Sequence, residues 1–300
     1  FKIVRYSLKG IKLKRRTKMK YQLPETETGK DVWQLAREIS LSAGEILLDW
    51  WPKAKEISDA GQNDIVTNVD RECEAHIRSA IAAHFPEHGI FGEEEKGDDP
   101  TKGWTWIIDP IDGTQNYAWG IPCFSTVIAL AKDGEVVAGV NFDPINNEMF
   151  HAARGKGAFL NEEKIQVNDV SKFEDVVLVT DPAYGPPSGT TDTLQMLRKI
   201  WPSLKTARMI GSSALSISYV AAGRMDIFVH HRLQPYDQAA GMILMEEAGG
   251  LITDRQGNRA QLYSDGVIAS SSTIHQEFME KTKHLQWRKP SSRALNPRER

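Results

Sequence analysis

The stretch "WIIDPIDGTQNY", residues 106–117, decides how this chain is interpreted, because it places two aspartates at the end of an apolar run. We expect "WTWIID" to be a β-strand that Pro110 stops, since proline cannot donate to a strand ladder. Pro110 fixes one backbone angle and Gly113 permits an unusual one, so Asp109 and Asp112 can converge on one point. Taken alone, the same letters are also typical of an Asp-Pro turn followed by an Asp-Gly turn.

Two converging carboxylates repel each other unless a cation lies between them. Oxygen ligands without paired His or Cys favour Mg²⁺, Mn²⁺ or Ca²⁺ over Zn²⁺, and Mg²⁺ is the first choice. The backbone amides of Gly113 and Thr114 can line a concavity that binds an anion. Ser212 and Ser213 open a predicted helix later in the chain and form a second candidate of this kind. A metal cluster beside amide donors is typical of a phosphate site.

Further acidic residues stand at the ends of predicted elements, where functional sites are usually built. Glu93 and Glu94 follow a strand in "IFGEEE", and Asp237 begins a helix. Asp70 lies at the boundary of another helix, where its side chain could cap the first turn. Alone, the glutamates fit a solvated loop and Asp237 fits an N-cap. Their occurrence together favours a site.

Periodicity predicts a chain of helices packed beside mainly antiparallel or mixed sheets, which is an α+β or mixed α/β fold. Residues 124–149 alternate between β-rich runs and turns, which indicates antiparallel hairpins rather than βαβ units. We expect helices over 27–50, 71–85 and 190–201, two more after "GSS" and "QP", and a last one over 275–284. A divide near 170–190 separates a metal-binding α+β half (19–180) from a substrate-side α/β half (181–287).

The formal net charge of −3 conceals an asymmetry between the ends of the chain and its body. Residues 1–18 carry eight Lys or Arg and no acid, and residues 288–300 carry five against one Glu, which leaves about −15 for the body. We expect both tails to be disordered. The basic head is either an arm for nucleic acid or a membrane surface, or an extension that precedes a natural start at Met19. Nucleic-acid binding is expected only through these tails.

Composition limits the compartment and the class of protein. With 300 residues and 40% hydrophobic content, the chain can bury a sizeable core. It has two cysteines, which provide no disulfide framework, and no apolar run approaches the roughly 18 to 20 residues that span a bilayer. We therefore expect a cytoplasmic protein that does not enter membranes.

The chain resembles the inositol monophosphatase family of metal-dependent, lithium-sensitive phosphomonoesterases. The similarity rests on "NDIVTNVD", "IFGEEE", "WIIDPIDGTQNY", "GKGAFLN", "IGSSA" and "YDQAAGMILMEEAGG", which occur in family order from about residue 30 to 285. The resemblance implies a layered α-β-α-β-α sandwich, a cytoplasmic homodimer, and two to three Mg²⁺ in each site. It also implies that Mn²⁺ can substitute and that Li⁺ or Ca²⁺ inhibits.

The resemblance also implies roles for individual residues. Glu93, Asp109 and the Ile111 carbonyl would bind a first metal, and Asp109, Asp112 and Asp237 a second. Asp70 and Thr114 would orient and deprotonate the attacking water, with Glu94 in support. The implied substrate contacts are Asp112, Gly113, Thr114, Gly211, Ser212, Ser213, His230 and Asp237.

One departure from the family pattern bears on the substrate. His230 stands where a family Glu hydrogen-bonds a sugar hydroxyl, and neutral His donates and accepts once each, whereas Glu only accepts. His230 is equally well explained as an incidental polar residue at the cleft edge. Inositol monophosphate is thus the default substrate among small polyol and sugar phosphates. Histidinol phosphate, fructose 1,6-bisphosphate and nucleotide 3'-phosphates stay open. A different class of function, regulatory binding of nucleic acid or a transcription partner through the tails, is the alternative.

Overall fold

The structure is a computed structural model that describes residues 22–289 apart from positions 54, 62–63 and 182–186. The basic head at 1–18 and the tail from residue 290 onward lie outside the described residues. Among the residues that are described, no helix is both long enough and apolar enough to cross a membrane.

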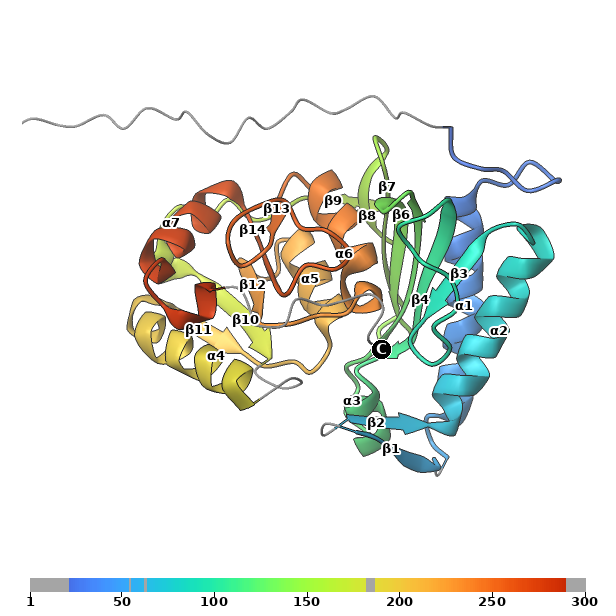
Figure 1. The fold of residues 1–300 in the computed structure, drawn as a ribbon, viewed down its shortest axis with the longest axis horizontal. Helices are drawn as coiled ribbons and strands as arrows, with labels where there is room; N and C mark the ends of the chain where they lie inside the picture. Colours follow the sequence, from blue (N-terminus) through green and yellow to red (C-terminus); the bar gives the residue numbers. More distant parts are fainter. Residues whose placement is uncertain (1–21, 54, 62–63, 182–186, 290–300) are drawn as a thin grey trace, which may run out of the picture.

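The first sheet has seven strands in the order β3-β4-β5-β6-β7-β8-β9 (Figure 1). Only β3 and β4 are parallel, and every other neighbouring pair is antiparallel. The antiparallel hairpins predicted after residue 124 are therefore confirmed. The strands are β3 (Gly89–Gly92), β4 (Trp104–Asp112), β5 (Ser125–Lys132), β6 (Glu135–Asp143), β7 (Glu148–Ala153), β8 (Gly157–Leu160) and β9 (Glu163–Ile165).

The second sheet is mixed and has five strands in the order β11-β10-β12-β14-β13. β10 pairs in parallel with both β11 and β12, whereas β14 is antiparallel to β12 and β13. A separate hairpin joins β1 (Ile57–Gly61) and β2 (Asp64–Thr67). The strands of the second sheet are β10 (Val177–Asp181), β11 (Thr206–Arg208), β12 (Ile227–His230), β13 (Leu251–Thr253) and β14 (Val267–Ser270).

Helices cover both sheets and fill the space between them (Figure 1). α1 (Val32–Trp50) and α2 (Asn68–His84) lie on the outer face of the first sheet. α5 (Ser213–Ala221) and α6 (Pro235–Glu247) lie between the sheets, and α4 (Pro187–Ile200) and α7 (Ser272–Thr282) cover the far face of the second. The short α3 (Thr114–Trp119) follows β4. The α-β-α-β-α sandwich is thus confirmed.

β4 shows why the sequence folds into these layers. Its residues are buried on both faces, which explains a continuous apolar run instead of alternation. Trp106 and Ile108 point into the core beneath α1 and α2, whereas Ile107 belongs to the core that surrounds α5 and α6. The strand that carries the two aspartates therefore lies at the centre of the protein, between two apolar layers.

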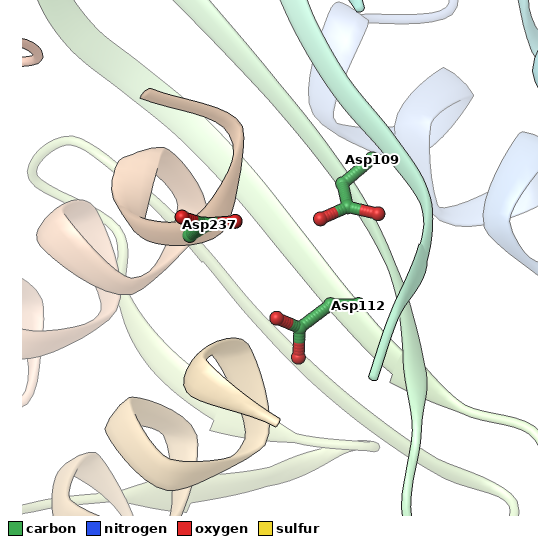
Figure 2. A group of neighbouring side chains, drawn as sticks. All are labelled: Asp109, Asp112 and Asp237. Carbon is green, nitrogen blue, oxygen red and sulfur yellow. The ribbon is translucent and has the colours of Figure 1, made fainter. Parts of the chain in front are cut away.

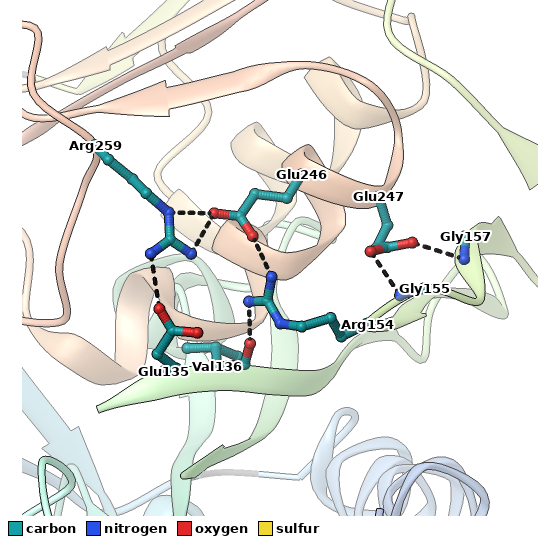
Figure 3. A network of polar contacts seen from close by, with 8 residues as sticks. All are labelled: Glu135, Val136, Arg154, Gly155, Gly157, Glu246, Glu247 and Arg259. Atoms are coloured by element: carbon teal, nitrogen blue, oxygen red, sulfur yellow. Dashed lines mark hydrogen bonds and ion pairs between the residues drawn. The ribbon is translucent and has the colours of Figure 1, made fainter. Parts of the chain in front are cut away.

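α6 packs directly on the first sheet and is fixed at its C-terminal end by polar contacts. At Gly139 of β6, an added Cβ would lie 2.7 Å from the Ala240 Cα, so only glycine allows this close approach. The Glu246 carboxylate contacts Arg154 and Arg259, at 3.0 and 2.8 Å (Figure 3). The close packing at Ala240 and the contacts of Glu246 therefore fix both ends of α6, including its first turn, relative to the first sheet.

Four predicted helices begin at other residues than the sequence suggested; α4 begins at Pro187 rather than 190, and α7 at Ser272 rather than 275. The predicted starts at residues 27 and 71 are wrong, because α1 begins at Val32 and α2 at Asn68. Asp31 accepts a hydrogen bond from the Gln34 amide, and Thr67 caps α2 in the same way. Capping side chains rather than apolar spacing thus set the starts of α1 and α2.

The prediction that Pro110 stops the strand is also wrong, because β4 continues to Asp112. The register against β5 shifts here: Asp109 pairs with Val127, and Asp112 pairs with Ser125. β4 therefore contains one extra residue, and proline is tolerated at such a bulge because the ladder is already interrupted. Residues three apart in a regular strand face opposite sides. The bulge lets both aspartates face the same side.

The predicted basic tail begins too early at residue 288. Trp287 is buried and belongs to the 3-10 helix η3 (Gln286–Arg288), and its carbonyl accepts a hydrogen bond from Arg255 at 2.5 Å. The Arg288 guanidinium donates to the carbonyls of Arg255 and Met279. Arg288 is therefore part of the folded protein, because the buried tryptophan beside it anchors this turn.

Candidate metal centre

Three aspartates from two elements converge on one point (Figure 2). Each of Asp109, Asp112 and Asp237 offers one carboxylate oxygen, and these oxygens lie within 4.8 Å of one another. Asp109 and Asp112 come from the bulged end of β4 and are almost fully buried, and Asp237 comes from the first turn of α6. The predicted convergence of the "DPIDGT" aspartates is therefore present, and it includes the acid that is distant in sequence.

Backbone amides orient two of these carboxylates. Asp109 accepts a hydrogen bond from the Ile111 amide at 3.0 Å, and Asp237 accepts one from the Gln234 amide at 2.6 Å. Gln234 occupies the N-cap position of α6, so the view of Asp237 as the cap itself is wrong; it is the third helical residue and completes a capping box.

The N-terminus of α5 holds Asp112. The Ser212 hydroxyl donates to Asp112 Oδ2, and the amides of Ser213 and Ala214 donate to the same carboxylate at 3.2 and 3.1 Å. The Ser212 oxygen also accepts from the Leu215 amide at 3.2 Å, so its one proton is directed to Asp112. The contacts that the structure gives Ser212 and Ser213 thus orient a carboxylate of the cluster.

The electrostatics of the cluster favour a bound cation. Burial raises the pKa of Asp109 well above its usual range, and Glu93, Asp112 and Asp237 add to the shift. Burial also raises the pKa of Asp112, to about 6, despite the donors from α5. Burial and then Asp237 raise the pKa of Glu93, which shares a hydrogen bond with Asp109. An oxygen-only acidic cluster of this kind fits a hard divalent cation such as Mg²⁺.

A buried carboxylate and a hydroxyl lie beside the cluster. Thr114 Oγ1 lies 3.2 Å from Asp70 Oδ1 and 2.9 Å from the Ile111 carbonyl oxygen, and its single proton can serve only one of them at a time. The other oxygen of Asp70 accepts from the amide of Thr67 at 2.8 Å and from its hydroxyl. Burial raises the pKa of Asp70 to about 6. The prediction of Asp70 as the cap is wrong, because Thr67 is the N-cap of α2. Asp70 is the third helical residue and completes a capping box, while its second oxygen faces Thr114.

Gly113 occupies a place that a side chain could not. Its φ of 97° is left-handed, and an added Cβ would lie 3.1 Å from the carbonyl oxygens of Cys123 and Gly211. The glycine is the N-cap residue of α3, so the amides of Gly113 and Thr114 follow directly after the cluster. That these amides bind an anion stays a prediction.

The loop that carries Glu93 and Glu94 is held by a residue that the sequence reasoning missed. Glu74 of α2 is buried, and its two oxygens accept from the amides of Glu94 and Glu95 at 2.9 Å each. Arg78 forms an ion pair with the same carboxylate at 2.8 Å. Glu74 follows Asp70 by four residues and therefore lies on the same buried face of α2. An acidic residue on the apolar face of a predicted helix was the signal that could have identified it.

Two further buried residues were missed, and both contact the loop that precedes α5. Asn116 of α3 donates to the carbonyl of Ile210, and Asp181 at the end of β10 accepts from the Gly211 amide. The "TQNY" motif contained Asn116, but no spacing rule connects it with residue 210. Asp181 is the last residue of β10, and no motif around it pointed to a site.

His230 ends β12 and is buried. Its Nδ1 accepts a hydrogen bond from the Arg232 amide at 3.2 Å, so in the neutral ring the proton resides on Nε2. Burial lowers the pKa of His230 to about 4, which keeps the ring neutral at physiological pH. The acceptor atom Nδ1 of His230 is therefore occupied by the Arg232 amide, and only the Nε2–H donor remains available.

Comparisons with known proteins agree with this fold. The model of the inositol monophosphatase family matches residues 30–290. The chain is 39% identical over 241 residues to a fructose-1,6-bisphosphatase/inositol-1-monophosphatase of Thermotoga maritima, covering 79% of this chain and 90% of that protein. It is 35% identical over 226 residues to the Nus factor SuhB of Escherichia coli K12, covering 74% and 84%.

A solved structure extends the comparison to three dimensions. The extragenic suppressor protein suhB from Bartonella henselae superposes with a TM-score of 0.80 at 33% identity, covering 84% of this chain and 98% of that one. Fold and site together define an acidic centre suited to metal ions, built from the end of β4 and the first turn of α6. The chain belongs to the inositol monophosphatase family.

Proposed function

We propose that this protein is a Mg²⁺-dependent phosphatase that hydrolyses a phosphate monoester of a small polyol or sugar, with inositol monophosphate as the default substrate. One observation carries the proposal. The cluster of Asp109, Asp112 and Asp237 lies beside a further carboxylate, that of Asp70, which is within hydrogen-bond distance of the hydroxyl of Thr114. A protein that only bound a partner would have no need for a base and a hydroxyl next to a metal cluster.

The acidic residues would hold two to three Mg²⁺, with Mn²⁺ as a substitute. Glu93, Asp109 and the Ile111 carbonyl would provide one set of ligands, and Asp109, Asp112 and Asp237 another. Even when Thr114 donates to it rather than to Asp70, the Ile111 oxygen keeps a second lone pair for a cation. Bound metal ions lower the pKa of a coordinated water and neutralise charge on the phosphoryl oxygens.

Asp70 and Thr114 would move the proton of the attacking water. Thr114 Oγ1 accepts that proton while its own passes to Asp70 Oδ1, 3.2 Å away. Asp70 can take the proton only when ionised, so with its pKa near 6 the rate should rise as the pH increases through about 6. Glu94 would support this arrangement through the loop that Glu74 holds.

The amides of Gly113 and Thr114 would bind phosphate oxygens, and His230 would contact the leaving group. Because His230 Nε2 can only donate, it would pair with an oxygen acceptor of the leaving group. A hydroxyl oxygen of inositol or of a sugar can accept, and so can a ring oxygen. This differs from a Glu at the same place, which requires a hydroxyl proton.

The experiment is a phosphate-release panel, with and without Mg²⁺, on inositol monophosphate, fructose 1,6-bisphosphate, histidinol phosphate and 3'-phosphoadenosine 5'-phosphate. We expect Mg²⁺-dependent release that Li⁺ and Ca²⁺ inhibit. A preference for one ester would identify the leaving group, and similar rates on all would indicate a broad scavenger. No release from any ester with Mg²⁺ or Mn²⁺ would contradict the proposal. The expected homodimer can be tested by light scattering on the same sample.

A second candidate function is regulatory binding of nucleic acid or a transcription partner. The observation that favours it is that several relatives, including the one from Escherichia coli, are named Nus factor SuhB rather than after an enzymatic activity. It predicts salt-dependent binding of RNA that is lost when residues 1–18 are removed. Affinity that the deletion leaves unchanged would count against a role for the basic head.

A further inference from the structure

The loop between β11 and α5 carries no ligand of the acidic cluster, yet each of its residues 210–212 is held by a different element. The Ile210 carbonyl accepts from Asn116, the Gly211 amide donates to Asp181, and the Ser212 hydroxyl donates to Asp112. We propose that Asn116, together with Asp181, is a positioning residue that holds this loop so that the N-terminus of α5 orients Asp112. The inference rests on the proposed role of Asp112 as a metal ligand.

The amide group of Asn116 is suited to this task because one nitrogen carries two protons. Nδ2 donates to the carbonyl of Cys123 at 2.7 Å and to the carbonyl of Ile210 at 2.8 Å. Cys123 lies just before β5 of the first sheet, whereas Ile210 belongs to the segment that leads into α5. The side chain is 9% exposed, so these two carbonyls would lose their partner if the nitrogen were removed.

Asp181 anchors the next residue from the opposite side. Its Oδ1 accepts from the Gly211 amide at 3.2 Å, and it lies at the carboxyl end of β10 in the second sheet. Gly211 has a φ of 78°, and an added Cβ would lie 2.9 Å from the Asn116 nitrogen. The turn is therefore tight, left-handed and enclosed between the two anchors.

The two anchors, Asn116 and Asp181, act on the acidic cluster through α5, the helix that follows the loop. Ser212 is the N-cap of α5, and the donors from Ser212, Ser213 and Ala214 all go to Asp112. Displacing the loop would move these donors together, because α5 begins directly after the two anchored residues. Asp112 would then rotate away from the position in which its oxygen faces Asp109 and Asp237.

The test compares Asn116→Asp with Asn161→Asp. Asn116→Asp keeps the shape of the side chain but places a carboxylate oxygen, which cannot donate, against the carbonyls of Cys123 and Ile210. Asn161→Asp likewise removes an amide donor to a carbonyl: Asn161, in the turn between β8 and β9, donates to the carbonyl of Asn147, in the turn between β6 and β7. The first readout is hydrogen exchange of metal-free protein over residues 209–216. The second is Mn²⁺ affinity by electron paramagnetic resonance. The third is the split between KM and kcat.

We expect Asn116→Asp to accelerate exchange over 209–216 and to weaken Mn²⁺ binding, each by about tenfold, the factor that one ordinary hydrogen bond corresponds to. kcat should fall more than KM rises, and Asn161→Asp should leave all three readouts unchanged. Faster exchange throughout the chain would mean that Asn116 merely stabilises the fold and would overturn the proposal. So would unchanged exchange and unchanged Mn²⁺ affinity.

A second pair of variants keeps the proposal testable if Asn116→Asp does not fold. Asp181→Ala removes the acceptor for the Gly211 amide and should reproduce the local exchange and the weaker Mn²⁺ binding. Asp181→Asn keeps an oxygen at the same place and should restore both. Equal exchange rates over 209–216 and equal Mn²⁺ affinities in the two variants would overturn the proposal. If the wild-type protein hydrolyses no phosphate ester, the proposed function fails, but the exchange and Mn²⁺ measurements still decide this inference.

Discussion

The two ends of α6 carry acidic residues in opposite circumstances. At the C-terminal end, Glu246 contacts Arg154 and Arg259, and Glu247 accepts from the amides of Gly155 and Gly157 at 2.8 and 2.9 Å (Figure 3). At the N-terminal end, Asp237 faces the carboxylates of β4 (Figure 2). One end pairs each acid with donors, whereas the other brings acids together.

The difference separates acids that stabilise the fold from acids that form the site. A helix C-terminus disfavours negative charge, and the arginines and amides there offset that penalty. The N-terminus of α6 favours negative charge, but burial and then the crowded carboxylates keep the pKa of Asp109 well above its usual range. Such repulsion is tolerated in the protein when a bound cation relieves it. Three changes test this contrast.

The largest effect is expected for Asp109→Asn. The variant keeps an oxygen that accepts from the Ile111 amide but removes the charge that the proposed metal sites share. Activity should fall by about 10³-fold, because several kcal/mol of transition-state stabilisation are lost. Without metal, the free energy of unfolding should rise by about 1 kcal/mol, since repulsion is relieved. Phosphate release and urea denaturation in EDTA measure both. A metal-free protein that is less stable than wild type would contradict the picture.

Glu246→Gln should have the opposite effect on stability. The side chain is half-buried, and removing its charge leaves Arg154 and Arg259 without their shared partner. We expect the free energy of unfolding to fall by about 2 kcal/mol, less than for a fully buried pair. Activity per folded molecule should remain near wild type. A large loss of kcat with unchanged stability would show that this end of the helix also belongs to the site.

The third test is the pH dependence of stabilisation by Mg²⁺. Burial raises the pKa of Asp70 and of Asp112 to about 6 in the folded state, against about 4 when unfolded. The folded protein then binds more protons between pH 4 and 6, so without metal these groups contribute stability that is lost as the pH rises through about 6. Mg²⁺ requires the ionised carboxylates and should raise Tm little at pH 5.

At pH 7.5 and 100 times its dissociation constant, Mg²⁺ should contribute about 2.7 kcal/mol, or roughly 5 °C in Tm. Glu246→Gln provides the control, because it should show the same pH-dependent increment on a lower baseline. Thermal melts with and without Mg²⁺ at pH 5 and pH 7.5 measure this increase in Tm. An increment of equal size at pH 5 and pH 7.5 would show that these carboxylates do not control metal binding.

The motifs predicted the family, the five-layer sandwich and the grouping of Asp109, Asp112 and Asp237. The reason is that short motifs encode local backbone geometry, and apolar runs encode burial on one or two faces. Helix starts were placed less well, because Asp31 and Thr67 determine them through single side-chain hydrogen bonds. Periodicity carries no information about such a bond.

By itself the sequence determined which residues are acidic, apolar or glycine, and hence the class of chemistry that the chain can support. Only the tertiary structure decided how β4 bulges at Pro110 so that two aspartates face one side, and that the donors of α5 reach Asp112. Asn116 and Ile210 are 94 positions apart and meet only because two sheets pack on the same pair of helices. Contacts of that kind depend on packing across layers, which no local pattern of residues records.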